Sequence, residues 1–327
     1  MEQTLTNDIA AYAGYLNDDV ELLKTTSGGI ATALSKQILR RGGYVAGVTY
    51  SPDFHKVQYE IANEEAELDK FMGSKYVEAD KRSIYKDVKA LLDADKTVLF
   101  FGLPCVVAAM KTYLKKEYAN LYTVELICHG HTSAEVHRQY VEHLEKKHSA
   151  KVVDFSVRRK KKGWMPPYLY VKLNNGKEIW KSFYHTEYGF AFQTMAKLPC
   201  YHCRFKGTAR VADLMLGDFW GATPADPFWN VNGVSSVLVR TEHGHELLTG
   251  TEGITLFETT VERVVEHNAN VVRSRKADPK KEVFEARFQA RGLFYAVKKT
   301  KSLKLKLLHR IPESIKNLAK KFLKRNA

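Results

Sequence analysis

The chain has 327 residues, of which 44% are hydrophobic and 27% charged, a composition typical of a globular protein with a large core. It contains no apolar run of membrane-spanning length and no segment typical of a signal peptide, so we expect a cytoplasmic, reducing location. Of the net charge of +14, residues 298–327 contribute eleven Lys and Arg against the single acid Glu313. The body is therefore nearly neutral, and we do not expect nucleic acid as a partner.

The first 150 residues alternate between helix and strand patterns. Helices are predicted over 29–41, 84–93, 106–116 and 134–148, and strands over 44–50, 57–61, 97–101 and 121–127. Ser27 and Ser133 are predicted to cap the first and the last of these helices. The alternation favours an α/β layer with a largely parallel sheet.

Beyond Val152 the pattern changes. Strands predicted over 168–173 and 177–180 flank Asn174-Asn175-Gly176, residues that tolerate the positive φ of a tight hairpin turn. The predicted fold class is therefore α/β: a mixed sheet with flanking helices, largely parallel in the N-terminal part and more antiparallel in the middle.

The basic tail, residues 298–327, contains a predicted amphipathic helix over 312–325. Its apolar residues recur at spacings of three and four residues, which places them on one face of the helix, opposite a row of lysines. Two interpretations stay open. The helix packs on the body with a solvated basic face, or it lies at the cytoplasmic face of the membrane as a peripheral contact.

The four cysteines fall at informative positions. Cys105 follows the predicted strand 97–101 and the loop Gly102-Leu103-Pro104, at the start of a helix, and Cys128 lies at the end of the strand 121–127. Cys200 and Cys203 form a Cys-x-x-Cys chelate. Carboxyl ends of parallel strands meet at one sheet edge, where α/β proteins bind ligands. Four thiolates suffice for a closed tetrahedral metal site or a four-iron cluster. Spacing alone leaves zinc and iron–sulfur both open.

Six segments in order resemble the coenzyme F420 hydrogenase/dehydrogenase beta subunit family over about residues 18–248. They are "SGGIATAL", "GSKYVEAD", "VLFFGLPCVVAAMK", "ELICHGHTS", "CYHCRFKGTARVADLMLGDFWG" and "NGVSSVLVRTEHGHELL". The resemblance implies an oxidoreductase with FAD and a 4Fe-4S cluster, which passes electrons between an iron–sulfur donor and an organic hydride acceptor. It divides the chain into an oxidoreductase domain, 1–297, with family segments 18–80 and 81–250, and the tail.

The sequence departs from the family pattern in three ways. It has no ferredoxin-like cysteine run, which implies a separate ferredoxin-like electron donor. Val106 stands where the family usually has Gln, and His131 and Thr132 alter the motif after Cys128. The ligands are intact, but the acceptor could be a deazaflavin or a substrate of a glycan (polysaccharide-biosynthesis) pathway.

The resemblance also assigns site residues. The cluster ligands would be the four cysteines. Residues expected to bind FAD are Ser27, Gly28, Gly29, Gly73, Ser74, Lys75, Tyr76, Gly102, Pro104, Gly130 and Asp218. The glycine-rich helix start at 27–29 suits phosphates. Lys75 would stabilise reduced flavin, and either His129 or His131 would supply a proton during hydride chemistry.

Each assignment has a simpler alternative: a capped helix start at 27–29, a solvated Lys75 and a structural His129. Arg210, Asp213 and Asp218 could orient cofactor groups, and a structural ion pair is the simpler account of the first two. Phe219-Trp220 are expected to lie in the core, with a stacking platform that shields the cluster as the alternative. Residues 158–162 (RRKKK) are expected to form a solvated turn, with an acidic-ferredoxin docking patch as the alternative.

Two other functions stay open. The first is a zinc-stapled nucleic-acid-binding protein that uses the basic tail, although the chain has no second Cys-x-x-Cys unit for a zinc ribbon. The second is a non-enzymatic electron-transfer subunit of a larger complex.

Overall fold

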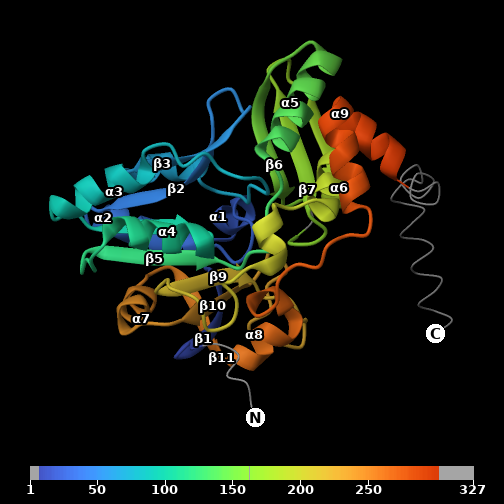
Figure 1. Ribbon diagram of the computed structural model, residues 1–327. Coiled ribbons are helices and arrows are strands. Elements are labelled where there is room, and N and C mark those ends of the chain that lie inside the picture. The colour runs from blue at the N-terminus through green and yellow to red at the C-terminus, as the bar shows by residue number, and fades with distance from the viewer. Residues whose placement is uncertain (1–6, 162, 302–327) are drawn as a thin grey trace.

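The computed structural model describes residues 7–161 and 163–301 (Figure 1). The helix expected over 312–325, and with it the membrane contact, lies outside these residues. Within the described ranges, none of the helices has both the length and the apolar character needed to cross a membrane.

The described chain forms two sheets. The larger has the order β11-β1-β10-β9-β5-β4-β2-β3, with parallel β2–β4, β4–β5 and β5–β9 pairs and antiparallel pairs elsewhere. Its strands are β1 (Ala10–Leu16), β2 (Tyr44–Tyr50), β3 (Val57–Ala62), β4 (Val98–Gly102), β5 (Leu121–Leu126), β9 (Leu214–Asp218), β10 (Ser235–Val239) and β11 (Ile254–Thr259). The predicted mixed α/β class is confirmed.

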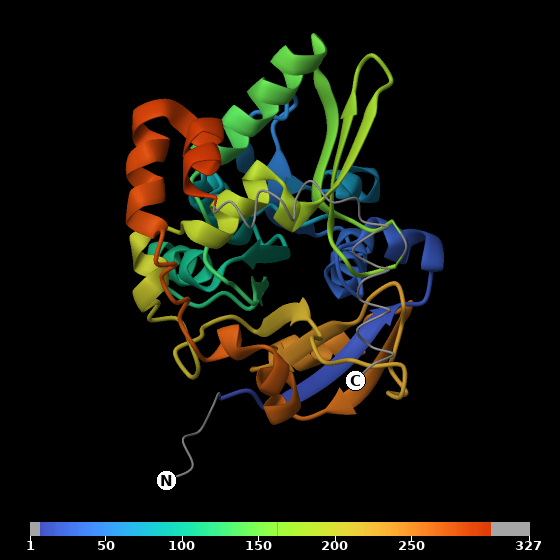
Figure 2. The same ribbon diagram turned by 90° about the vertical axis from the view of Figure 1, so that its right-hand side faces the viewer.

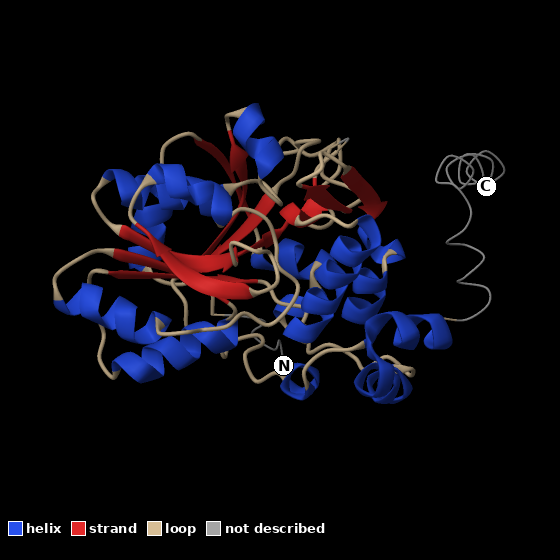
Figure 3. Ribbon diagram, turned by 90° about the horizontal axis from the view of Figure 1, so that it is seen from above, coloured by secondary structure: helices blue, strands red, loops and turns tan. Residues whose placement is uncertain are grey.

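Helices cover both faces of the main sheet (Figure 3). They are α1 (Asp19–Lys24), α2 (Ile30–Arg40), α3 (Ile84–Asp93), α4 (Pro104–Leu114), α7 (Glu242–Thr249) and α8 (Val261–His267), with 3₁₀ turns η1 (Glu65–Lys70) and η4 (Ala269–Val271). Side chains of β4 alternate between the layers. Leu99 packs with Ile30 and Leu34 of α2, whereas Val98 and Phe100 pack with α3 and α4.

The smaller sheet, β6-β7-β8, is antiparallel. Its strands are β6 (Val152–Arg159), β7 (Tyr168–Leu173) and β8 (Glu178–Ser182), and α5 (Ala134–His148), α6 (Glu187–Thr194) and α9 (Lys281–Thr300) lie on one side of it (Figure 2). Gly176, with φ +84°, forms the expected turn. On β7, Leu169, Val171 and Leu173 are fully buried against these helices. The predicted antiparallel middle part is confirmed.

The sequence missed β1. This strand lies between β10 and β11, so partners far along the chain define it. Its sequence, AAYAGYL, lacks β-branched residues and gives little strand signal. Gly14 is needed there, because a Cβ would lie 2.7 Å from the Leu256 side chain and 2.9 Å from the Thr255 carbonyl oxygen.

Candidate functional site

The four cysteines come from three segments that meet at the carboxyl edge of the main sheet. Cys105 occupies the first turn of α4, Cys128 follows β5, Cys200 lies in η3 (Leu198–His202) and Cys203 follows it. Burial raises the pKa of Cys105, and the neighbouring thiols of Cys203 and Cys200 raise it further. Burial also raises the pKa of Cys128 to about 11, with smaller contributions from Cys105 and Cys200. The thiols are therefore electrostatic neighbours.

The cysteines are free thiols. Among the described residues, no three His, Cys, Asp or Glu side chains are grouped closely enough to hold a metal ion as they stand. The donor set nevertheless fits a thiolate-bound metal centre. The Gly130 N–H donates to Cys128 Sγ at 3.2 Å, a bond of the kind that stabilises metal-bound thiolates. Gly130 has φ +86°, and a Cβ there would lie 3.1 Å from Cys200 Cβ.

Backbone contacts hold the chelate against its neighbours. The Cys200 N–H donates to Lys197 O at 2.9 Å, and the Lys197 N–H donates to His131 O at 3.1 Å. On the other side, the Cys203 N–H donates to Ser274 Oγ at 2.9 Å. The position of the chelate is thus set by the loop after β5 and by the segment before α9.

The expected Arg210–Asp213 ion pair is wrong. Arg210 Nη1 instead donates to Glu125 Oε1 at 2.8 Å, and both side chains are almost completely buried. The Asp213 carboxylate accepts hydrogen bonds from the Thr123 N–H and hydroxyl and from the Thr241 hydroxyl. Asp213 is therefore satisfied by neutral donors, while Arg210 anchors the segment after the chelate to β5.

A second polar group forms around Asp218 at the end of β9. Its carboxylate accepts two hydrogen bonds from Arg158, at 2.6 and 3.1 Å, and one from Trp164 Nε1 at 3.0 Å. Arg158 is 7% exposed. Tyr76 faces the same guanidinium, and burial raises the pKa of its hydroxyl to about 12 against the opposing effect of Arg158.

Residues 158–162 were expected to form a solvated turn, but Arg158 and Lys160 are buried, so this expectation is wrong for these two residues. A docking patch that uses the whole basic run is wrong for the same reason. Lys160 is 8% exposed and donates to Leu22 O at 2.7 Å, Ser27 O at 2.6 Å and Thr25 Oγ1 at 3.4 Å. Burial lowers its pKa to about 7. A run of like charges in the sequence could not reveal these partners, because Leu22 belongs to α1 and Thr25 and Ser27 belong to the turn that follows it.

That turn differs from the prediction in one detail. Gly29, with φ +79°, is the N-cap of α2 and supplies no side-chain bond, so the expected Ser27 cap is wrong. The Ser27 hydroxyl instead donates to Val234 O at 2.9 Å. Ser133 does cap α5, accepting from the Glu135 N–H. Within the described chain, the N-terminus of α2 therefore has no side-chain oxygen capping its backbone N–H groups.

Gly28 has a packing reason to be glycine. Its N–H donates to Ser235 Oγ at 2.9 Å. A Cβ at this position would lie 2.2 Å from Gly14 O and 2.5 Å from the Ser235 nitrogen. The close backbone approach in the structure is thus to β1 and β10.

The segment 73–76 lies beside this turn and beside the cysteines. Ser74 Oγ approaches Thr26 Oγ1 at 3.5 Å, and Val77 forms a parallel bridge with Thr132 after Cys128. The Lys75 ammonium donates to the carbonyl oxygens of Phe71 at 2.8 Å and Met72 at 3.1 Å. Burial lowers the pKa of Lys75 to about 7. The expectation of a solvated Lys75 is wrong.

His129 lies between the two groups. Burial lowers its pKa; the positive charges of Lys206, Arg275 and Arg158 act in the same direction, and Asp218 opposes them. The residue still borders solvent, and its ring is only partly covered by the groups around it. His131 has different charged neighbours. Burial lowers its pKa, and the negative charge of Glu78 opposes this effect only in part. The remaining predicted residues, Gly102 and Pro104, precede Cys105 at the end of β4 and the start of α4.

Sequence reasoning missed Arg158, Lys160 and Trp164. Phe219 is buried in the core as expected, but Trp220 is half-buried and stacks on Trp164 at a 5.2 Å centroid distance. The Arg158 guanidinium lies 5.6 Å from the Trp220 ring centroid. The only available signal was that Trp164 follows the basic run at 158–162 within a few residues.

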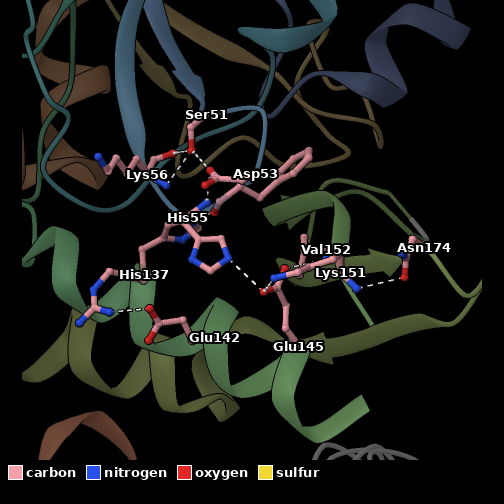
Figure 4. Close-up of polar contacts among 12 residues, drawn as sticks. Ser51, Asp53, His55, Lys56, His137, Glu142, Glu145, Lys151, Val152 and Asn174 are labelled. Carbon is pink, nitrogen blue, oxygen red and sulfur yellow. Dashed lines mark hydrogen bonds and ion pairs between the residues drawn. The ribbon is translucent and has the colours of Figure 1, made fainter. Parts of the chain in front are cut away.

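Two cavities lie elsewhere. One, of about 580 Å³, lies by α1, α2 and residues 250–253. The other, of about 490 Å³, is lined by His55, Glu145 and Lys151 (Figure 4). There, Glu145 accepts from His55 Nε2 at 3.0 Å and from Lys151 Nζ at 2.9 Å, which joins the β2–β3 loop to α5. Neither cavity is lined by a predicted site residue.

Fold and site together define a mixed α/β protein with four free thiols at one sheet edge, next to a buried basic and aromatic group. Residues 95–263, just over half of the chain, match the family model for the C terminus of the coenzyme F420 hydrogenase/dehydrogenase beta subunit. The chain belongs to the coenzyme F420 hydrogenase/dehydrogenase beta subunit family, whose redox character it shares at that general level.

A solved structure supports the fold. It is described as a xenon derivatization of the F420-reducing [NiFe] hydrogenase complex from Methanosarcina barkeri. The match has 18% identity and a TM-score of 0.56, and covers 88% of this chain and 95% of the matched chain. No curated protein matches the sequence.

Proposed function

We propose that the chain is an FAD- and 4Fe-4S-dependent oxidoreductase that passes electrons between an iron–sulfur donor and an organic hydride acceptor. The observation that carries this proposal is the convergence of four free cysteines beside His129 and the Arg158–Asp218 group. Membership of a hydrogenase and dehydrogenase family supports a redox role.

In this proposal Cys105, Cys128, Cys200 and Cys203 ligate the cluster. Residues 27–29 and 73–76 bind FAD, together with Asp218, Gly102, Pro104 and Gly130. The two cofactors would supply one-electron storage and hydride exchange respectively. The uncapped N–H groups of α2 suit phosphate oxygens, because helix N-termini attract anions.

The protein's own groups have distinct tasks. His129 is neutral near pH 7, since its pKa is lowered, so a ring nitrogen is available to accept a proton. Arg158 fixes Asp218, and Lys160 fixes the carbonyls before Gly28. The stacked rings of Trp164 and Trp220 pack beside this group, with the Arg158 guanidinium 5.6 Å from the Trp220 ring centroid.

We also propose a separate electron-donating protein as partner, since the neighbour from Methanosarcina barkeri belongs to a hydrogenase complex. The acceptor would be a small molecule, either a deazaflavin or an intermediate of a glycan pathway. A purely electron-transferring subunit is the remaining alternative, and hydride transfer to a deazaflavin in single-turnover assays would exclude it.

Anaerobic purification followed by iron, zinc and flavin analysis tests the proposal. We expect about four irons and one FAD per chain, with visible absorption and an electron paramagnetic resonance signal on reduction. Stoichiometric zinc without iron would overturn it and favour the zinc-stapled alternative.

A further inference from the structure

Among the residues that the structure describes, two basic side chains adjoin the cysteines without a carboxylate at ion-pair distance. Lys206 Nζ donates to Cys128 O at 2.8 Å and to Asn270 O at 2.5 Å. The Arg275 guanidinium donates to Gln193 O and lies 5.6 Å from the Phe192 ring centroid. Within residues 7–161 and 163–301, neither side chain forms an ion pair.

Both residues are held against the chelate by the backbone. Lys206 follows Cys203 by three positions and bonds the main chain of Cys128, so it bridges two of the three cysteine segments. Arg275 follows Ser274, whose hydroxyl is bonded to both the N–H and the carbonyl oxygen of Cys203. Their positions are therefore coupled to those of the thiols.

The charges of both residues also interact with the sulfurs. Burial lowers the pKa of Lys206, and the thiols of Cys128, Cys203 and Cys200 act in the opposite direction. Burial likewise lowers the pKa of Arg275, opposed by Tyr201, Cys200, Asp278 and Cys128. A half-buried cation that donates to neutral carbonyls is costly, and a thiolate centre would supply the missing negative charge.

We propose that Lys206 and Arg275 are positioning residues that compensate the negative charge of the thiolate centre and make its reduction easier. The inference rests on the proposed function. Reduction adds one electron, taken from the iron–sulfur donor, with no bond made or broken. Two nearby positive charges stabilise the more negative reduced state more than the oxidised state, and so raise the reduction potential.

The test is a spectroscopic redox titration of the purified holoprotein and four variants. Lys206→Gln and Arg275→Gln each remove a charge, whereas Lys206→Arg keeps it. Arg204→Gln is the matched control, because Arg204 is exposed and lies 5.2 Å from the Phe205 ring centroid. We expect each of the first two to raise the oxidised-to-reduced ratio about tenfold at fixed potential, a shift of about 59 mV for one electron. Lys206→Arg and Arg204→Gln should stay near wild type.

The outcomes are distinguishable. Unchanged potentials in Lys206→Gln and Arg275→Gln, with iron retained, would overturn this inference and leave the proposed function standing. Zinc without iron in the wild type would overturn both. Loss of iron from Lys206→Gln but not from Lys206→Arg would support charge compensation. Equal loss of iron from Lys206→Gln and Lys206→Arg would overturn charge compensation by Lys206. The reduction potential of Arg275→Gln would then test charge compensation by Arg275 separately.

Discussion

Replacing Asp218 by Asn removes the charge that neutralises a buried arginine. The Arg158 side chain is 6% exposed and the Asp218 side chain 12% exposed. Removing one partner of a buried ion pair costs roughly 3–5 kcal/mol, because the other charge stays buried without compensation. Asn keeps an oxygen that can still accept from Trp164, so we expect the free energy of unfolding to fall by about 3 kcal/mol.

Urea unfolding followed by tryptophan fluorescence measures this loss. Asp154→Asn is the matched control, since its pair with Arg159 has side chains 39% and 32% exposed and should lose less than about 1 kcal/mol. Adding Arg158→Met to Asp218→Asn should recover part of the stability, because the stranded charge is gone. Equal losses in Asp218→Asn and Asp154→Asn would refute the reasoning.

Neighbouring features lead to three further predictions. Cys128→Ser should lose most of the iron measured by mass spectrometry, since the four thiols act as one unit; full iron retention would contradict this. Gly28→Ala should lower the free energy of unfolding by about 3 kcal/mol or more, because its Cβ would meet the Gly14 and Ser235 backbone. Gly176→Ala is the control, because a Cβ there meets no neighbour and only the positive φ is unfavourable; it should lower the free energy of unfolding by roughly 1–2 kcal/mol in the same urea titration. Equal losses in Gly28→Ala and Gly176→Ala would contradict the steric argument. Between about pH 7 and pH 9, wild-type stability should rise by up to about 1.4 kcal/mol per pH unit from Lys160 alone, because the unfolded chain still binds the proton that the folded lysine has lost. Lys160→Met should flatten this slope, and parallel curves would show that Lys160 does not titrate there.

Local patterns predicted the elements whose signals are local. The helices at 84–93 and 134–148 and the strand at 44–50 agree with the structure to the residue. The two single cysteines were placed correctly because strand ends can be recognised from apolar runs and the helix starts that follow.

The remaining features depend on tertiary partners. A basic run normally indicates a solvated turn, but Arg158 and Lys160 are buried because Asp218 and the carbonyls before Gly28 receive them. Ser27 looks like a cap in sequence, yet its hydroxyl is taken by Val234 from a distant loop. Neither the burial of the basic run nor the lost cap could be predicted from local sequence preferences, because the groups that accept these hydrogen bonds lie far away in the chain.

The position of β1 constrains how the protein folds. Tyr12 is paired with Val237 of β10 and with Glu258 of β11, so its partners are more than two hundred residues away. During synthesis this first strand emerges long before its partners, and its backbone hydrogen bonds must wait for them. Such non-local pairing slows folding and leaves an unpaired strand exposed for longer. Completion of the main sheet is therefore a late event, and the nascent chain has most need of protection from aggregation before β10 and β11 arrive.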